Sequence, residues 1–338
     1  MLSLATLKEA FRTYVHCITR TSMRLKADLT LLLVSIIWGS AFVAQRVAGQ
    51  QGSVYLFNGG RYLLAALVVL PVAMRAGRNK HLIHSLARDQ FKWMFIAGFF
   101  LFVGSAVQQV GLLYTTAGNA GFITSLYVVF VPILLTLFWR EKSHWMAIAA
   151  VVLAVLGAFL LSTHGSFELR KGDAVELGGA LFWTLHVIVL GKYASRFESM
   201  SFSLGQLIVC GLLNLALGIF VEPMISFNRS LLLAIAYTAF FSLGLCYTLQ
   251  VWAQKHTPPA DAALILSLES VFAVLSGWVF LNETLAGIQV LGCVLIFSAV
   301  LLSQFREWSL RGTPRSPRSS MMDSERGTIE ADHLIEGR

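Results

Sequence analysis

Charged residues are scarce in this chain: they make up 13% of the 338 residues, whereas hydrophobic residues make up 56%. The mean hydropathy is +0.69. Soluble domains ordinarily have about 25% charged residues, so this composition excludes an ordinary soluble domain. We expect the hydrophobic excess to lie in a lipid bilayer rather than in an enlarged core.

Cysteine is also rare, and its placement argues against two kinds of site. The four cysteines show no paired spacing, and three of them lie inside long apolar stretches, where a thiol behaves as a small apolar group. They are Cys17, Cys210, Cys246 and Cys293. We therefore expect no disulfide, no metal site and no cofactor.

The two ends of the chain lack apolar runs. The first 22 residues have no continuous apolar region of the kind found in a signal peptide, and Met23 is a second candidate for the start of translation. Residues 1–28 are therefore predicted to be a cytoplasmic N-terminal segment. The tail, residues 305–338, is rich in Ser, Arg, Gly and Pro and is predicted to be disordered and cytoplasmic.

Between these ends, the chain is dominated by apolar stretches of bilayer-spanning length. A hydrocarbon core about 30 Å thick needs about 20 apolar helical residues, because lipid offers no partner to an unpaired backbone amide or carbonyl. Ten stretches qualify: residues 29–48, 55–74, 93–113, 119–138, 144–163, 174–191, 202–221, 230–252, 260–281 and 285–304. The predicted fold class is all-α, a polytopic membrane protein with ten transmembrane helices.

Lys and Arg are distributed unevenly between the loops. If the N-terminus is cytoplasmic, 21 of the 26 lie in inner segments and four in outer loops. Such a bias places both termini in the cytoplasm. The net charge of +8 would suggest nucleic acid as the partner of a soluble chain. Here it reports topology and contact with anionic membrane lipids, so no nucleic-acid partner is expected.

The two sets of five spans resemble each other. A shift of 145 positions pairs Asp28 with Asp173 and Trp38 with Trp183. A shift of 142 gives the further pairs Gln108 and Gln250, Thr115 and Thr257, Asn119 and Asp261, Ser125 and Ser267, and Glu141 and Glu283. Because five is odd, the second set enters the membrane inverted, which predicts two inverted five-helix repeats, residues 29–163 and 174–304. Secondary transporters use such repeats around a midplane site, although a duplicated bundle that simply folds well is an alternative.

Four runs of sequence resemble a known family. They are WGSAFVAQ from Trp38, FNGGRYLLAAL around Arg61, GLLYTTAGNAGFITSLYVVFVPIL from Gly111 and TPPADAALILSLESVFAVLSGWVFLNETL from Thr257. They resemble the drug/metabolite transporter superfamily, EamA type, over about residues 28–304. The resemblance implies a ten-helix carrier of bacterial inner membranes that exports small metabolites such as amino acids or their derivatives. It does not name the substrate.

Apart from Arg46, which lies at the outer end of the first span and is counted with the outer loops, Arg61 is the only Lys or Arg inside a predicted span. It lies about 10 Å from the outer end of that span at 1.5 Å per residue. A cation at this depth is a candidate for binding a carboxylate or phosphate. The alternatives are an arginine that reaches the outer headgroups or one that holds neighbouring helices through backbone carbonyls. Its counterpart in the second half is Gln206, so the two halves differ here.

Glu269 lies near the middle of the ninth span. An isolated charged carboxylate there costs several kcal/mol, so we expect it to be protonated, paired or hydrated. A role in proton coupling follows, which its repeat counterpart Tyr127 could not perform. A structural role is the alternative.

Other polar and aromatic residues are candidates to line a permeation path. By helical spacing, Trp38 shares a face of its helix with Gln45, and Trp183 shares a face of its helix with His186. The full set is Trp38, Gln45, Gln108, Asn119, Tyr127, Trp183, His186, Gln250 and Ser267. For each of them, packing or hydrogen bonding between helices is the alternative. Pro132 is expected to kink the fourth span.

The leading hypothesis is a secondary transporter of the bacterial inner (plasma) membrane, not an enzyme. It would export small metabolites (amino acids or derivatives, with amphipathic drugs as further candidates) by alternating access, with proton exchange through Glu269. No P-loop motif occurs, which argues against drive by ATP. The expected partners are a small-molecule substrate, protons and membrane lipids, and the expected assembly is a monomer or homodimer.

Two other classes stay open. A membrane-embedded enzyme acting on lipid intermediates would need acid, base or metal ligands on one face, and we count only Arg61, Glu269 and His186 in the spans. Whether these three meet in space would discriminate. A scaffold subunit would instead show apolar packing where a transporter has a water-filled cavity.

Overall fold

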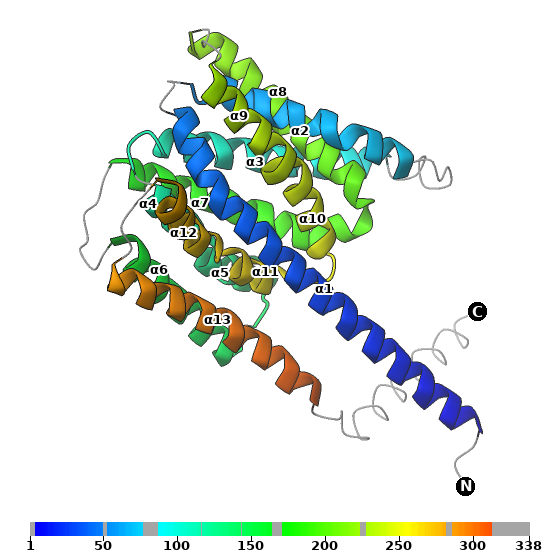
Figure 1. The fold of residues 1–338 in the computed structure, drawn as a ribbon. Helices are drawn as coiled ribbons and strands as arrows, with labels where there is room; N and C mark the ends of the chain where they lie inside the picture. The colour runs from blue at the N-terminus through cyan, green and yellow to red at the C-terminus, as the bar shows by residue number, and fades with distance from the viewer. Residues whose placement is uncertain are drawn as a thin grey trace.

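The computed structural model describes residues 4–49, 53–76, 87–115, 117–142, 144–163, 171–223, 228–281 and 286–312. All regular elements in these ranges are helical (Figure 1), which confirms the predicted all-α class. Eight helical stretches are long and apolar enough to cross a membrane, and two shorter apolar helices cover Trp145–Leu161 and Gly287–Ser303.

The helices have the following bounds. They are α1 (Leu4–Gly49), α2 (Tyr55–Ala76), α3 (Ala87–Gly111), α4 (Ala117–Ser125), α5 (Tyr127–Trp139), α6 (Trp145–Thr163), α7 (Lys171–Tyr193), α8 (Ser199–Val221), α9 (Arg229–Tyr237), α10 (Cys246–Ala253), α11 (Pro259–Leu266), α12 (Glu269–Leu281) and α13 (Gly287–Gly312). A short 3-10 turn covers Ala194–Arg196, and a π-helical segment, Thr238–Leu245, joins α9 to α10.

The two ends of the bundle differ from the sequence prediction. Helix α1 begins at Leu4, so most of the N-terminal segment before residue 29 continues the helix of the first span. Helix α13 continues to Gly312, so residues 305–312, expected to be disordered, are helical. The rest of the tail lies outside the described residues.

Helix contacts in the two halves follow the same plan. Helix α2 packs on α8 and α6 packs on α13, and these two pairs lie at opposite edges of the bundle (Figure 1). Helix α3 packs on α7 in the way that α1 packs on α10 and the π segment. The long helix α1 also contacts α9, α11 and α12, so it lies against the eighth and ninth spans of the second half.

Small residues allow α6 and α13 to approach closely. A Cβ atom added to Gly292 would lie 2.5 Å from the carbonyl oxygen of Gly157, and one added to Gly157 would lie 2.7 Å from that of Gly292. Close backbone approach at small residues is a common way to join helices in membranes, where van der Waals contact replaces the hydrophobic effect.

We expect the variant Gly292→Ala to be destabilised by about 1–3 kcal/mol, because its methyl group would overpack this contact. Gly287→Ala, at the start of the same helix, is the matched control, since a methyl group there meets no atom within 4 Å. Thermal unfolding of the purified protein should show a lower midpoint for Gly292→Ala alone. Equal midpoints for the two variants would contradict the close packing.

The start of α2 is held by a carboxylate from the end of α8. Glu222 accepts hydrogen bonds from the backbone N–H groups of Val54, Tyr55 and Leu56 at 2.7–3.1 Å. The first N–H groups of a helix have no partner within the helix, and the positive end of the helix dipole favours an anion there. This contact fixes the entry of the helix that contains Arg61.

Two spans are interrupted at equivalent places. The fourth is divided at Leu126, between α4 and α5, and the ninth at residues 267–268, between α11 and α12. The hydroxyls of Ser125 and Ser267, which are repeat counterparts, each donate to the carbonyl three residues earlier at 2.7 Å. Such bonds compete with the regular helical ladder and tighten the chain locally.

Pro132 does not cause the interruption. It lies inside α5, six residues after Leu126, and α5 continues through it. Its repeat counterpart Val274 lies inside α12, and the ninth span is divided all the same. The expected kink at Pro132 is therefore not the feature that shapes the fourth span.

Candidate functional site

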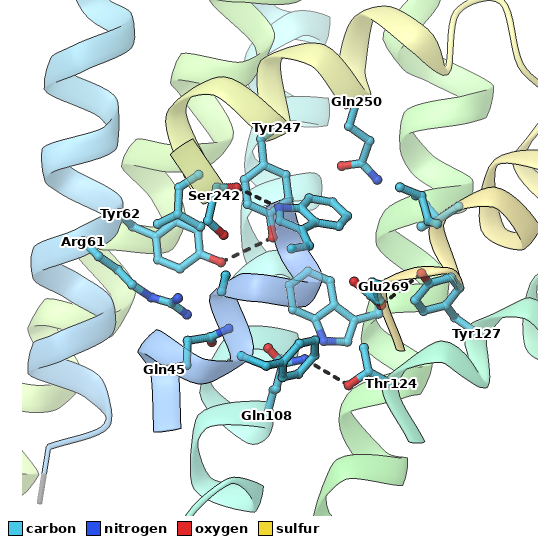
Figure 2. Close-up of a pocket in the computed structure, with 17 residues that line it drawn as sticks. Gln45, Arg61, Tyr62, Gln108, Thr124, Tyr127, Ser242, Tyr247, Gln250 and Glu269 are labelled. Carbon is cyan, nitrogen blue, oxygen red and sulfur yellow. Dashed lines mark hydrogen bonds between the residues drawn. The ribbon is translucent and has the colours of Figure 1, made fainter. Parts of the chain in front are cut away.

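A pocket lies where both interrupted spans meet α1, α2, α3, α7 and the π segment (Figure 2). Its lining consists of Trp38, Ala41, Phe42, Gln45, Arg61, Tyr62, Gln108, Thr124, Tyr127, Trp183, Val187, Ser242, Leu243, Tyr247, Gln250, Leu266 and Glu269. Its volume is about 40 Å³, which is room for about three water molecules. A solute the size of an amino acid fits only if the walls move apart.

Most of the residues singled out from the sequence meet in this pocket. They are Trp38, Gln45, Arg61, Gln108, Tyr127, Trp183, Gln250 and Glu269. In the described part of the chain, Asn119, His186 and Ser267 are not among the lining residues. His186 Nε2 lies 2.9 Å from Gln206 Oε1, and the Ser267 hydroxyl bonds within its own span. For His186 and Ser267 the structure shows the alternative arrangement, hydrogen bonding between or within helices.

Arg61 extends into the pocket rather than toward the lipid headgroups (Figure 2). It is 2% exposed, and its Nε donates to Asn58 Oδ1 at 3.0 Å. The guanidinium carbon lies 4.9 Å from the ring centre of Phe57 and 5.3 Å from that of Tyr62. Among the described residues, no carboxylate forms an ion pair with it. The pocket therefore contains a cation whose charge no protein carboxylate neutralises directly.

Glu269 lies across the pocket from Arg61 (Figure 2). It begins α12, and Tyr127, which begins α5, donates its hydroxyl to Glu269 Oε1 at 3.0 Å. The interrupted spans thus aim one side chain each at the same point. Interrupted spans of this kind build the binding sites of many transporters.

Aromatic rings form another wall of the pocket. The indole N–H of Trp38 donates to the backbone oxygen of Ser242 in the π segment at 2.7 Å. The ring of Tyr247 lies 5.1 Å from that of Trp38, and its hydroxyl lies 3.5 Å from that of Tyr62. Rings in this arrangement offer faces that attract cations.

Three buried polar atoms of the lining have no hydrogen-bond partner among the described residues. They are Oε1 of Gln45, Oε1 of Gln250 and Nε1 of Trp183. Buried polar groups are nearly always satisfied by protein, ordered water or a bound molecule. These atoms are therefore suited to hold water or a polar solute.

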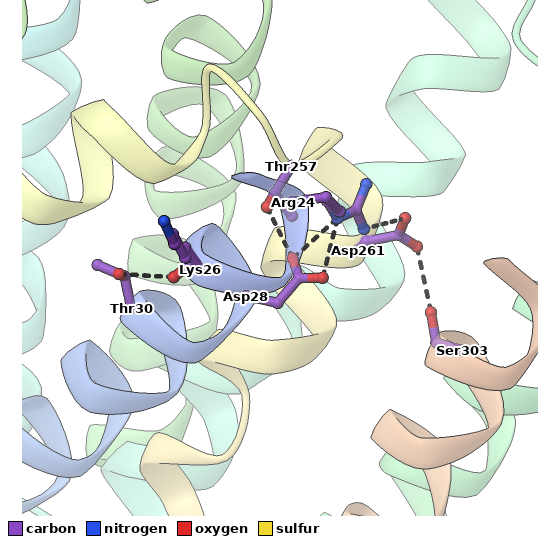
Figure 3. A network of polar contacts seen from close by, with 7 residues as sticks. All are labelled: Arg24, Lys26, Asp28, Thr30, Thr257, Asp261 and Ser303. Carbon is purple, nitrogen blue, oxygen red and sulfur yellow. Dashed lines mark hydrogen bonds and ion pairs between the residues drawn. The ribbon is translucent and has the colours of Figure 1, made fainter. Parts of the chain in front are cut away.

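A buried network ties α1 to the second half (Figure 3). Arg24 Nε lies 2.9 Å from both carboxylate oxygens of Asp28, and its Nη2 lies 2.9 Å from Asp261 Oδ2. Thr257 donates to Asp28 at 2.7 Å, and Ser303 donates to Asp261 at 3.1 Å. The network joins α1, α11, α13 and the loop before α11.

A related contact lies at the other end of the bundle. Thr115 donates to Asp173 Oδ1 at 2.6 Å. The shifts of 142 and 145 relate this pair to Thr257 and Asp28, so the same contact occurs twice, each time between the first half of the chain and the second.

Sequence reasoning missed several of these residues. It treated Asp28, Asp173 and Asp261 as markers of the repeat, because the pairing of Arg24 with a residue 237 positions away leaves no local pattern. It also missed Glu176, which lies in the predicted span 174–191 and is completely buried. That carboxylate was detectable as an ionisable residue inside a span.

Comparison with known proteins places the chain in a family. The profile of the EamA-like transporter family matches twice, over residues 25–163 and 170–305. An uncharacterized transporter of Archaeoglobus fulgidus is 35% identical over 84% of this chain and 87% of its own length. The threonine/homoserine exporter RhtA of Salmonella typhimurium is 29% identical over 44% of this chain and 51% of its own.

A solved crystal structure is similar in fold, with a TM-score of 0.69 over 82% of this chain and 98% of that one, at 15% sequence identity. At this identity the likeness concerns the fold alone. Together with the apolar helices, the sequence matches identify a multi-pass membrane protein. The chain belongs to the EamA-like transporter family.

Proposed function

We propose that the protein is a secondary transporter, not an enzyme, that exports small zwitterionic metabolites such as amino acids and their derivatives. The supporting observation is a pocket with Arg61 on one side and Glu269 on the other. Arg61 would bind a substrate carboxylate through charge-assisted hydrogen bonds, and Glu269 with the aromatic wall would bind an ammonium group. The relative named for threonine and homoserine export would handle solutes of this chemistry.

Alternating access is the proposed mechanism, with ten spans in two inverted five-helix repeats. Five pairs of repeat counterparts line the pocket together, which supports this plan. The pairs are Trp38 and Trp183, Phe42 and Val187, Gln108 and Gln250, Thr124 and Leu266, and Tyr127 and Glu269. Since Tyr127 and Glu269 touch each other, the proposed pseudo-two-fold axis would pass between them.

The two Thr–Asp contacts are proposed to be the gates of this cycle. We call Asp28–Thr257 the inner gate and Asp173–Thr115 the outer gate, following the cytoplasmic location of both termini. Both contacts are formed in this structure, in agreement with the small pocket volume. Opening to either side would require one of them to break while the other stays formed.

Removing one hydroxyl from each gate should shift the protein in opposite directions. Thr257→Val is expected to favour the inward-open form and Thr115→Val the outward-open form, each by about tenfold, because a hydrogen bond to a charged group contributes about 1.5 kcal/mol or more. The measurement is the labelling of a cysteine introduced at Ala41 by a membrane-impermeant thiol reagent added to one side of the membrane. The native cysteines are first replaced by alanine. Labelling that rises from the same side in both variants would contradict the assignment.

The direct test is transport by the purified protein in proteoliposomes. Counterflow of radiolabelled amino acids should be saturable and absent from protein-free liposomes. Metabolite profiling of the medium of cells with and without the protein would identify the solute. No movement of any amino acid, nucleoside or amphipathic cation would refute the proposal.

The enzyme alternative receives less support from the geometry. It requires Arg61, Glu269 and His186 to meet around one reacting group. Arg61 and Glu269 both line the pocket, whereas His186 is hydrogen-bonded to Gln206.

The proposed location is the bacterial plasma membrane, with both termini in the cytoplasm. The uneven distribution of Lys and Arg supports this orientation. Large apolar side chains such as Phe220, which is 87% exposed, would face membrane lipids. The proposed partners are thus the solute, protons and lipids, and the assembly stays predicted as a monomer or homodimer.

A further inference from the structure

One buried carboxylate lies just outside the pocket. Glu176 of α7 is 0% exposed. Its Oε2 accepts a single long hydrogen bond, 3.4 Å from Thr124 Oγ1, and its Oε1 has no partner among the described residues. No Lys, Arg or His in the described ranges forms an ion pair with it. A charged carboxylate in this setting would cost several kcal/mol, so the group requires a proton or another cation.

The protein makes room for a carboxylate at only one of two repeat-related positions, each formed by one residue from either half. A Cβ atom added to Gly111 would lie 2.6 Å from both Cγ and Oε1 of Glu176, so only glycine fits at that position of α3. The repeat counterparts of Glu176 and Gly111 are Leu31 and Ala253, both fully buried in one apolar cluster. The carboxylate therefore occupies a dedicated space rather than an accidental gap.

Glu176 is connected to the pocket by hydrogen bonds. Its donor Thr124 accepts from Gln108 Nε2 at 2.9 Å, and both residues line the pocket. One turn beyond Thr124, Tyr127 bonds to Glu269. The chain of polar contacts thus runs from Glu176 to the wall that also holds the second buried carboxylate.

The other side of Glu176 faces the outer gate. Asp173 lies one turn earlier on α7 and interacts electrostatically with Glu176. The elements packed against Glu176 present Gln108, Gly111 and Thr124, none of which titrates. Asp173 is thus the titratable neighbour through which a proton could arrive from outside.

We propose that Glu176 is a second proton-binding site, located between the pocket and the outer gate. This proposal rests on the proposed transport function. When the outer gate opens, a hydronium ion from the outer solution reaches Asp173 and gives up a proton, leaving water. That proton forms an O–H bond at Glu176 Oε1, the oxygen without a partner among the described residues. Protons that drive export enter from the outside, and Glu176 is on that side of Glu269.

Infrared difference spectroscopy of the purified full-length protein tests this directly. Raising the pH of the wild type should remove a protonated-carboxyl band with two components. Glu176→Gln should lose one component and Glu269→Gln the other, whereas Glu141→Gln, a change at a surface carboxylate that pairs with Lys192, should keep both. A Glu176→Gln spectrum that retains both components would overturn the proposal.

A second variant guards against misfolding. Gly111→Ala combined with Glu176→Leu copies the apolar Leu31–Ala253 pair at the repeat-related position, and should fold while losing the same component. A sodium ion is the competing occupant of this site. It would be shown if NaCl in place of KCl raised the unfolding temperature of the wild type but not that of Glu176→Gln. The site would then bind sodium, and the proton assignment would be wrong.

The spectrum needs no solute, so its result is separate from that of the counterflow assay. Failure of counterflow with a two-component band would refute transport and leave proton binding at Glu176 standing. Intact counterflow with a band that is unchanged in Glu176→Gln would leave transport standing and refute proton binding at Glu176.

Discussion

Replacing Arg61 by alanine is expected to weaken the binding of carboxylate-bearing solutes by roughly 10- to 150-fold, equivalent to about 1.5–3 kcal/mol. The guanidinium lines the pocket, and no carboxylate of the described residues forms an ion pair with it, so a solute carboxylate would gain the full charge-assisted interaction. The measurement is the concentration dependence of counterflow. Methyl esters of the same amino acids, which lack the carboxylate, should bind the wild type and Arg61→Ala about equally.

Two matched variants separate this effect from damage to the fold. Arg75→Ala removes an exposed arginine from the last turn of the same helix and should leave affinity unchanged. Arg61→Lys keeps the charge but loses the planar fork, so its affinity should fall between wild type and Arg61→Ala. An Arg61→Ala protein with wild-type affinity for a carboxylate-bearing solute would show that the arginine only holds helices together.

The variant Glu269→Gln is expected to abolish proton-driven accumulation while retaining counterflow. Glutamine preserves the size of the side chain and can still contact Tyr127, but it cannot bind and release a proton. The accumulation ratio in vesicles with an imposed pH gradient should fall to that of passive equilibration. Counterflow, which needs no net proton movement, should continue.

Tyr127→Phe is the companion variant, because it removes the hydrogen bond to Glu269 and leaves the carboxyl group in place. It should change the pH dependence of transport without abolishing coupling. Glu141→Gln, at the protein surface, should behave as wild type in both assays. If Glu269→Gln still accumulated solute against a gradient, coupling would have to be assigned elsewhere.

The fold class and the centre of the site could be predicted because their signals are local. A charged residue in an apolar stretch is conspicuous, and both Arg61 and Glu269 line the pocket. The repeat shifts also identified the pairs Gln108 and Gln250, and Trp38 and Trp183, and all four residues line the pocket. In each case a side chain that is costly in lipid is placed where other helices surround it.

Other features escaped the sequence because they depend on distant contacts. Asp28 and Asp261 read as charges near the ends of spans, and only the fold brings them to Arg24. No proline marks the interruption at Leu126 in the sequence. The hydroxyl of Ser125, next to it, instead donates to the backbone carbonyl three residues earlier. His186 was a candidate lining residue with hydrogen bonding between helices as its alternative, and its Nε2 lies 2.9 Å from Gln206 Oε1 on α8.

The contact between Tyr127 and Glu269 shows that, in a single chain with two related halves, two different residues can meet at equivalent positions. In a dimer of identical subunits, a residue on the symmetry axis meets its own copy. Two glutamates there would repel each other, and two tyrosines would offer no carboxyl group. Fusing two diverged copies allows a donor to face an acceptor at that place. In the proposed transport cycle, the carboxyl group of Glu269 would be reached in turn from each membrane face.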